Sequence, residues 1–125
     1  MIVRMPFSIS TTRTFAAAHA LRLYDGSMEP LHGHNWKVRV TVDAPELDSI
    51  GVVMDFHVLE RMVDEIIRPW HNHNLNEAAA FAKLNPTGEH VALTIGRSLS
   101  LPKNVRLSCV EVWETDENRA VYRPV

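Results

Sequence analysis

Three histidines stand at positions from which they could hold one metal ion. His32 and His34 are two positions apart, so on an extended chain both imidazole rings project from the same face. His19 lies upstream, at the end of a segment rich in β-prone residues. Three neutral imidazoles with a fourth position open to water or substrate are typical of catalytic zinc, whereas structural zinc sites are closed by four ligands and often contain thiolates. The spacing is compatible with a Zn²⁺ site, but the residues alone favour the alternative, which is three polar side chains with backbone partners.

A second His-x-His pair, His71 and His73, lies in a stretch rich in asparagine. Histidine titrates near neutral pH and functional groups concentrate on loops, so these two rings are candidates for catalytic proton transfer. A second metal site and simple surface exposure are the alternatives. His57 and His90 fall at or inside expected helices, where we interpret them as surface or capping residues.

Two stretches alternate apolar and polar side chains, which is typical of a strand with one buried face. Residues 6–15 do so roughly and residues 34–43 do so cleanly. Gly26 and Pro30 mark a loop between them. A hairpin of these two strands would bring His19 beside the other two histidines. The face of the second stretch that we expect to be buried carries Trp36, Val38, Val40 and Val42.

The middle of the chain predicts two helices. Apolar residues in 58–69 recur in steps of three and four, with Asp55 at the N-cap position. Thr87 marks the start of a second helix, which ends before Pro102.

Residues 104–114 and 119–123 predict two further strands, joined by a polar turn at 115–118. The order ββααββ predicts an α+β domain, in which two helices cover one face of an antiparallel four-stranded sheet. Open sheet edges are usually covered or paired with another subunit, so we also expect an oligomer.

The composition limits the class of protein. A chain of 125 residues fits one domain, here residues 1–125, and 46% hydrophobic with 22% charged residues can form a core. A net charge of −2 without a basic stripe argues against a nucleic-acid partner. No apolar run is long enough to cross a membrane. The lone Cys109 cannot form an internal disulfide, so we expect a soluble cytoplasmic protein.

Taken together, these segments resemble the 6-pyruvoyltetrahydropterin synthase and 6-carboxytetrahydropterin synthase family, whose members have the tunnelling fold. The resemblance runs through nearly the whole chain. It is carried by residues 15–19 (FAAAH), 31–35 (LHGHN), 51–56 (GVVMDF), 85–89 (NPTGE) and 112–115 (VWET).

The family resemblance implies roles for individual residues. It makes His19, His32 and His34 zinc ligands. It makes Glu114 the carboxylate that anchors the pterin ring, with Thr87 and Glu89 as further substrate-binding residues. A carboxylate can accept two parallel hydrogen bonds from a pterin's amino group and ring N–H. The resemblance also implies a homohexamer of two trimer rings that encloses a barrel, with active sites between subunits.

This chain departs from the family at the groups that move protons. Met28 stands where the family usually has a catalytic cysteine, and Glu29 follows it. A subgroup with Glu-x-x-His-Gly-His, which releases 6-hydroxymethyl-dihydropterin, is similar here. Where the family reads Leu-Asp-His, residues 70–72 read Trp-His-Asn, so His71 or His73 would have to act in place of the family's histidine.

The sequence therefore predicts a zinc-dependent lyase that acts on a dihydropterin such as 7,8-dihydroneopterin triphosphate, with Glu29, His71 and His73 as catalytic residues. One alternative is the variant reaction that forms 6-hydroxymethyl-dihydropterin through Glu29. The other is a homologue that binds zinc and pterin without catalysis.

Overall fold

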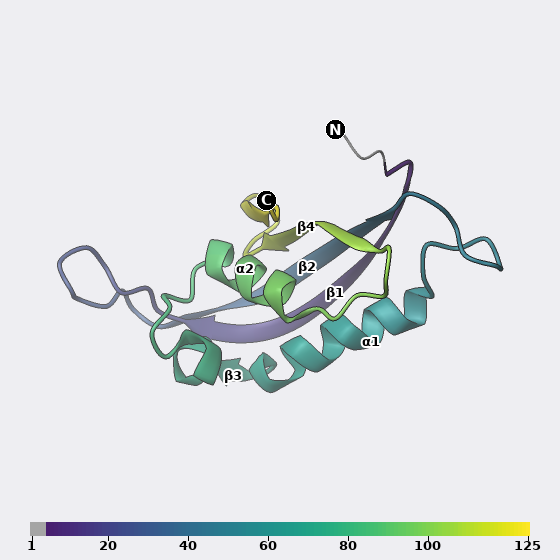
Figure 1. Cartoon of the computed structure of the whole chain (residues 1–125). Coiled ribbons are helices and arrows are strands. Elements are labelled where there is room, and N and C mark those ends of the chain that lie inside the picture. Colours follow the sequence, from purple (N-terminus) through teal and green to yellow (C-terminus); the bar gives the residue numbers. More distant parts are fainter. Residues whose placement is uncertain (1–4) are drawn as a thin grey trace.

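A computed structural model describes residues 5–125, and its framework is a long antiparallel hairpin (Figure 1). Strand β1 (Phe7–His19) pairs with β2 (His32–Ala44) along its full length. The register runs from Phe7 opposite Ala44 to His19 opposite His32. The hairpin predicted from residue alternation is confirmed, and it ends at the histidines.

The sheet has five strands in the order β3-β1-β2-β4-β5. Strands β4 (Arg106–Trp113) and β5 (Arg119–Tyr122) continue it antiparallel on the side of β2. The prediction of four antiparallel strands was wrong at the other edge, where β3 (His73–Asn74) runs parallel to β1. A strand of two residues is too short to show an alternating pattern. The adjoining backbone N–H of Asn72 donates to the carbonyl of Ala16 at 2.6 Å.

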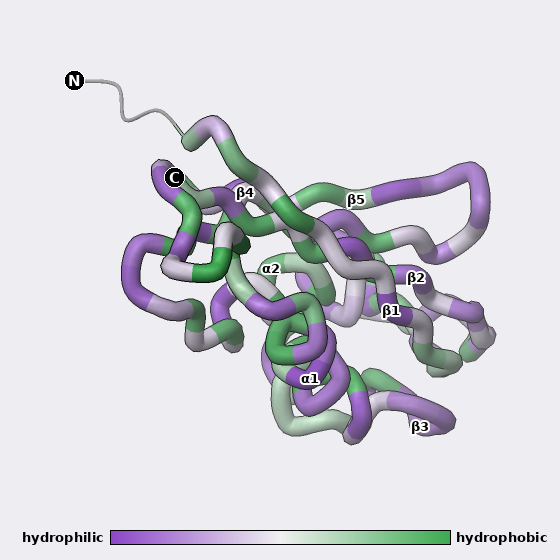
Figure 2. The backbone as a smooth tube through the Cα atoms, turned by 90° about the vertical axis from the view of Figure 1, so that its right-hand side faces the viewer, coloured by the Kyte–Doolittle hydropathy of each residue, from purple (hydrophilic) through white to green (hydrophobic). Residues whose placement is uncertain are grey.

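Both helices cover the same face of the sheet (Figure 1). Helix α1 (Phe56–Ile67) begins after Asp55, whose side chain accepts a hydrogen bond from the N–H of His57, as expected of an N-cap. The colours along α1 in Figure 2 alternate between hydrophobic and hydrophilic, as expected of an amphipathic helix. Helix α2 (Gly88–Ser98) begins after Thr87, which caps it. Among residues 5–125, neither helix is long and apolar enough to span a membrane.

Short elements connect the two helices. A 3₁₀ turn, η1 (Arg68–Trp70), contains Pro69 and ends α1. Two more 3₁₀ turns, η2 (Leu75–Glu77) and η3 (Ala79–Phe81), follow β3 and lead toward α2. This connection places the asparagine-rich stretch along the edge of β1.

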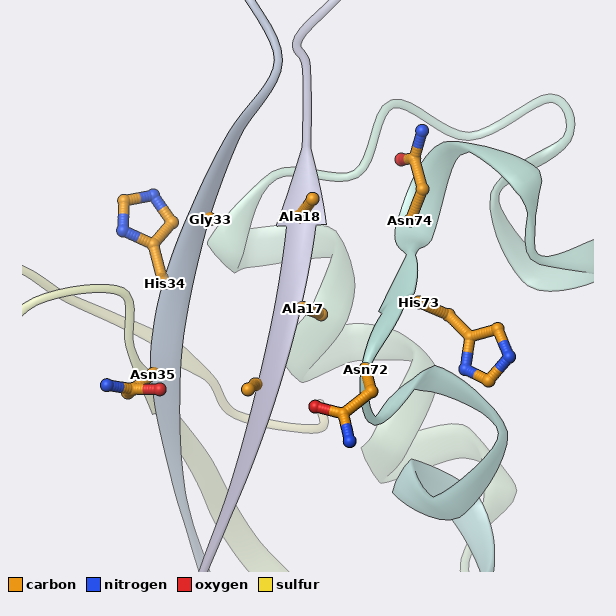
Figure 3. Close-up of a pocket in the computed structure, with 9 residues that line it drawn as sticks. Ala17, Ala18, Gly33, His34, Asn35, Asn72, His73 and Asn74 are labelled. Carbon is orange, nitrogen blue, oxygen red and sulfur yellow. The ribbon is translucent and has the colours of Figure 1, made fainter.

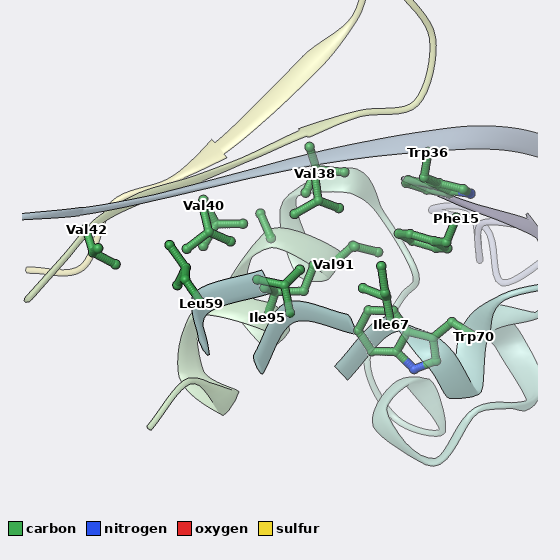
Figure 4. Close-up of a cluster of buried hydrophobic side chains, with 14 of the residues drawn as sticks. Phe15, Trp36, Val38, Val40, Val42, Leu59, Ile67, Trp70, Val91 and Ile95 are labelled. Atoms are coloured by element: carbon green, nitrogen blue, oxygen red, sulfur yellow. The ribbon is translucent and has the colours of Figure 1, made fainter. Parts of the chain in front are cut away.

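The hydrophobic core lies between the sheet and the helices and reaches the histidines. Trp36 is fully buried, and its ring stacks on Phe15 with centroids 5.7 Å apart. Its indole N–H donates to the carbonyl of Ala17 at 3.1 Å, and its ring meets that of His19 edge-on at 4.9 Å. Replacing such a tryptophan by alanine costs about 3–5 kcal/mol. Figure 4 shows Phe15 and Trp36 with the neighbouring core side chains Val38, Val40, Val42, Leu59, Ile67, Trp70, Val91 and Ile95.

Candidate metal centre

The hairpin brings the three predicted ligands together. His19 lies opposite His32 at the end of the β1–β2 ladder, and His34 lies two residues further along β2 on the same face. One ring nitrogen of each histidine lies within 4.8 Å of the others. The predicted convergence of the three rings is confirmed.

Backbone carbonyls fix the orientation of two of these rings. His19 Nδ1 lies 2.7 Å from the carbonyl oxygen of Pro86, and His32 Nδ1 lies 2.9 Å from that of Pro30. A carbonyl only accepts, so both Nδ1 atoms carry the proton, and in a neutral ring Nε2 is left with its lone pair. The two Nε2 atoms are 3.1 Å apart. Two facing lone pairs repel each other, and a cation between them would satisfy both.

His34 completes the donor set. Its Nε2 is buried and has no hydrogen-bond partner within residues 5–125. Burial, and next the neighbouring His19, lower the pKa of His34, although Glu114 acts in the opposite direction. A neutral ring with a free, buried lone pair is the form that binds a metal ion.

The three histidines therefore fit a metal ion. Nitrogen donors without thiolates, and carbonyls that hold the opposite ring nitrogen, are both typical of zinc ligation in enzymes. His19 is buried at 1% exposure, whereas the side chain of His32 is 40% exposed. The cluster is thus buried in the core at His19 and open to solvent at His32, where a further ligand could bind.

Two carboxylates flank the cluster. Glu29 Oε1 lies 3.8 Å from His32 Nε2 and accepts the N–H of Leu21 at 3.0 Å. Glu114 Oε2 lies 3.8 Å from His34 Nε2, and its Oε1 accepts the N–H of Gly88 at 3.2 Å. Each carboxylate thus accepts one backbone N–H and lies beside a histidine of the cluster.

A cavity of about 210 Å³ lies beside Glu114 at the start of α2. Glu89 lines it together with Glu114, so these two predicted substrate-binding residues share one space. Thr87 is placed differently, because its hydroxyl caps α2 by accepting the N–H of His90 at 3.0 Å. The cavity is lined by Gly88, Glu89, Glu114, Asn118, Arg119 and Ala120.

His71 and His73 lie along the edge of β1. The N–H of Ala16 donates to His71 Nδ1 at 3.1 Å, and His73 Nδ1 lies 2.7 Å from the carbonyl oxygen of His71. Within residues 5–125 no hydrogen bond joins either ring to the three-histidine cluster. Figure 3 shows His73 pointing away from His34.

The same edge borders a cavity of about 510 Å³. Asn72 lies there with a φ of 61°, a left-handed conformation that asparagine tolerates better than most residues. The cavity is lined by Ala16, Ala17, Ala18, Gly33, His34, Asn35, Asn72, His73 and Asn74 (Figure 3).

Residue patterns did not predict the backbone groups that orient the histidine rings. The carbonyls of Pro30 and Pro86 act through the backbone, so residue identity does not reveal them. Asn85 lies in the motif at residues 85–89 and Asn76 in the asparagine-rich stretch, but their hydrogen-bond partners lie 63 and 56 residues away along the chain.

Comparison with known proteins agrees with this geometry. The family model for 6-pyruvoyl tetrahydropterin synthase matches residues 8–125. The chain is 36% identical over 106 residues to the dihydroneopterin monophosphate aldolase of Pyrococcus furiosus, covering 83% of this chain and 86% of that protein. It is 34% identical over 114 residues to the 6-carboxy-5,6,7,8-tetrahydropterin synthase of Synechocystis, covering 87% of each.

A solved structure shows the same fold. The 6-pyruvoyl tetrahydropterin synthase of Caenorhabditis elegans superposes with a TM-score of 0.82 at 24% identity, covering 99% of this chain and 100% of that one. With the family model matching nearly the whole sequence, the chain belongs to the 6-pyruvoyl tetrahydropterin synthase family.

Proposed function

We propose that this protein is a zinc-dependent lyase that cleaves the side chain of a phosphorylated dihydropterin and releases 6-hydroxymethyl-7,8-dihydropterin. The observation that carries the proposal is the carboxylate of Glu29, 3.8 Å from His32 Nε2. The only cysteine of the chain, Cys109, lies on β4 opposite Thr41 of β2, away from the end of β2 that carries the histidines. Glu29 is therefore the base that the chain offers in place of a cysteine.

His19, His32 and His34 would hold the metal. A zinc ion bound there would act as a Lewis acid that makes a substrate hydroxyl more acidic. The three rings and the carbonyls of Pro30 and Pro86 are already arranged for this, with the Nε2 atoms of His19 and His32 facing each other.

Glu29 would start the cleavage by taking the proton of the hydroxyl at C2′ of the pterin side chain. The C1′–C2′ bond then breaks, and C2′ leaves as the aldehyde carbon of a two-carbon fragment that keeps the phosphate. The electron pair passes to C1′ and is delocalised into the pterin ring. Protonation of C1′ gives the hydroxymethyl product, so atoms and electrons balance without an oxidant or reductant.

His71 and His73 would supply the proton at C1′ from a neighbouring subunit. Both lie on the open edge of the sheet, and the side chain of His73 is exposed. This assignment rests on the predicted homohexamer, in which that edge meets another subunit.

Glu114 would anchor the pterin ring. Its second oxygen faces the histidine cluster, and the cavity beside it also exposes Glu89. Thr87 caps α2 with its lone pair, so its hydroxyl proton stays available for substrate. The ring would then lie next to the metal ligands, with its side chain directed toward Glu29.

Formation of a 6-carboxy product, supported by the Synechocystis relative, or of a 6-pyruvoyl product, supported by the family model, is the second candidate. We rank it lower because Met28 has no ionisable proton to replace the family's cysteine. A protein that binds pterin without catalysis is the third candidate.

A Glu29→Gln variant separates the enzyme from a mere binder. Glutamine can still accept the N–H of Leu21 but cannot take a proton, so the loop should keep its shape. We expect kcat with 7,8-dihydroneopterin monophosphate to fall by about 10²–10⁴-fold, with the dissociation constant for the pterin unchanged. A wild-type protein that binds the pterin but forms no product would contradict the enzyme and support the binder.

A further inference from the structure

Residues 20–22 connect His19 to the loop that carries Glu29, and they are held from both sides like a strand inside a sheet. In an extended chain the backbone groups of successive residues point to opposite sides. On one side, the N–H of Leu21 donates to Glu29 Oε1 at 3.0 Å, and the carbonyl of Leu21 accepts the N–H of Glu29 at 3.0 Å. Leu21 therefore binds both the side chain and the backbone of the proposed base.

On the other side, two asparagine side chains take the place of a neighbouring strand. Asn76 accepts the N–H of Ala20 at 2.8 Å and donates to the carbonyl of Ala20 at 2.7 Å. Asn85 does the same for Arg22, at 2.8 and 3.1 Å. A side-chain amide offers the same donor and acceptor as a peptide group, so each asparagine satisfies one residue of the segment completely.

The two asparagines come from separate parts of the chain. Asn76 lies in η2, after the edge strand, whereas Asn85 precedes α2. Asn85 is followed by Pro86, whose carbonyl orients the ring of His19. The same short stretch thus holds a metal ligand through its backbone and the segment leading to Glu29 through a side chain.

We infer that Asn76 and Asn85 are positioning residues that hold Leu21, and through it the carboxylate of Glu29, beside the metal ligands. They bind residues 20 and 22, the two neighbours of Leu21. Within residues 5–125, the N–H of Leu21 is the only backbone N–H that binds the carboxylate of Glu29. The expected effect on catalysis rests on the proposed function, whereas the expected effect on the hydrogen bond of the Leu21 N–H does not.

Asparagine-to-aspartate variants test the positioning without a change of size. An aspartate still accepts the backbone N–H but cannot donate to the carbonyl, so two oxygens would face each other. Amide hydrogen exchange of the zinc-loaded protein, followed by NMR, reports on the N–H of Leu21 directly. We expect it to exchange about tenfold faster or more in N76D and in N85D. Amides in the centre of β2 should keep their protection.

Three further variants calibrate the exchange measurement. E29A removes the acceptor and should expose Leu21 N–H, whereas E29Q keeps an acceptor and should protect it. N35D introduces the same charge at an exposed residue whose side chain makes no hydrogen bond within residues 5–125, and it should leave Leu21 protected. Unchanged exchange of Leu21 in both N76D and N85D would overturn the inference.

Kinetics test the catalytic consequence separately. N76D and N85D should lower kcat by about 10–100-fold with little change in KM, as expected for groups that orient a catalytic residue. Combined with E29Q, neither should lower kcat further, because the proton acceptor is already absent. A further drop of tenfold in the double variants would contradict an action through Glu29. If the wild type forms no product, the proposed function fails, and the exchange of Leu21 alone decides the positioning role.

Discussion

Zinc should stabilise this fold strongly, and the effect should depend on His34. The Nε2 of His34 is a buried atom with no hydrogen bond in the described part of the chain, so removing it costs the metal-free protein no hydrogen bond. A ligand that binds only the folded state at about a thousand times its dissociation constant contributes roughly 4 kcal/mol. For a chain of this length, 1 kcal/mol corresponds to roughly 4 °C in Tm, so zinc should raise Tm by about 15 °C.

The variant His34→Ala should lose most of that shift. Loss of a group that only orients a ligand weakens metal binding by about 10–100-fold. Loss of the ligand itself should therefore weaken metal binding by at least about 100-fold. At the same zinc concentration the stabilisation would fall to about 1.4 kcal/mol or less, which is a shift of at most about 6 °C.

Scanning calorimetry with and without zinc measures both shifts. His57→Ala is the matched control, because it removes a histidine whose side chain is 83% exposed and outside the cluster. It should keep the full shift of the wild type. If zinc raised the Tm of His34→Ala as much as that of the wild type, the assignment of the three histidines as one metal site would be refuted.

Three further outcomes follow from single contacts. Gly96→Ala should lower the free energy of unfolding by about 1 kcal/mol in urea denaturation. The new Cβ would lie 2.7 Å from the ring of Tyr122, and this overpacking outweighs the gain of about 1 kcal/mol in helix propensity. An unchanged unfolding midpoint would show that the Tyr122 ring moves aside freely. Thr87→Ala should cost about 1 kcal/mol in the same assay, because the N–H of His90 loses its cap, and a stability equal to wild type would contradict the capping role. Glu114→Gln should weaken pterin binding by about tenfold or more in calorimetric titration at unchanged zinc content, and unaltered affinity would remove Glu114 as the ring anchor.

The sequence predicted those features that depend on local pattern. Alternation in residues 34–43 and the caps Asp55 and Thr87 indicated the strand and both helix starts, which the structure confirms. The convergence of the histidines followed from pairing two strands, since the spacing of His32 and His34 fixes which face they share.

Features that depend on distant backbone contacts were not predictable in this way. Strand β3 exists because Asn72 and two residues after it find bonding partners on β1, not because of any pattern of their own. The hydrogen bonds of Asn76 and Asn85 likewise join a side chain to the backbone of a remote segment. Such contacts become visible only when the chain is folded.

The identity of the reaction product tests the central claim most directly. Zinc-loaded protein would be incubated with 7,8-dihydroneopterin monophosphate, and the products would be identified by mass spectrometry. We predict 6-hydroxymethyl-7,8-dihydropterin and a phosphorylated two-carbon aldehyde in equal amounts, with no product after the metal is removed by a chelator. A 6-pyruvoyl or 6-carboxy product, or the same turnover in metal-free protein, would contradict the account.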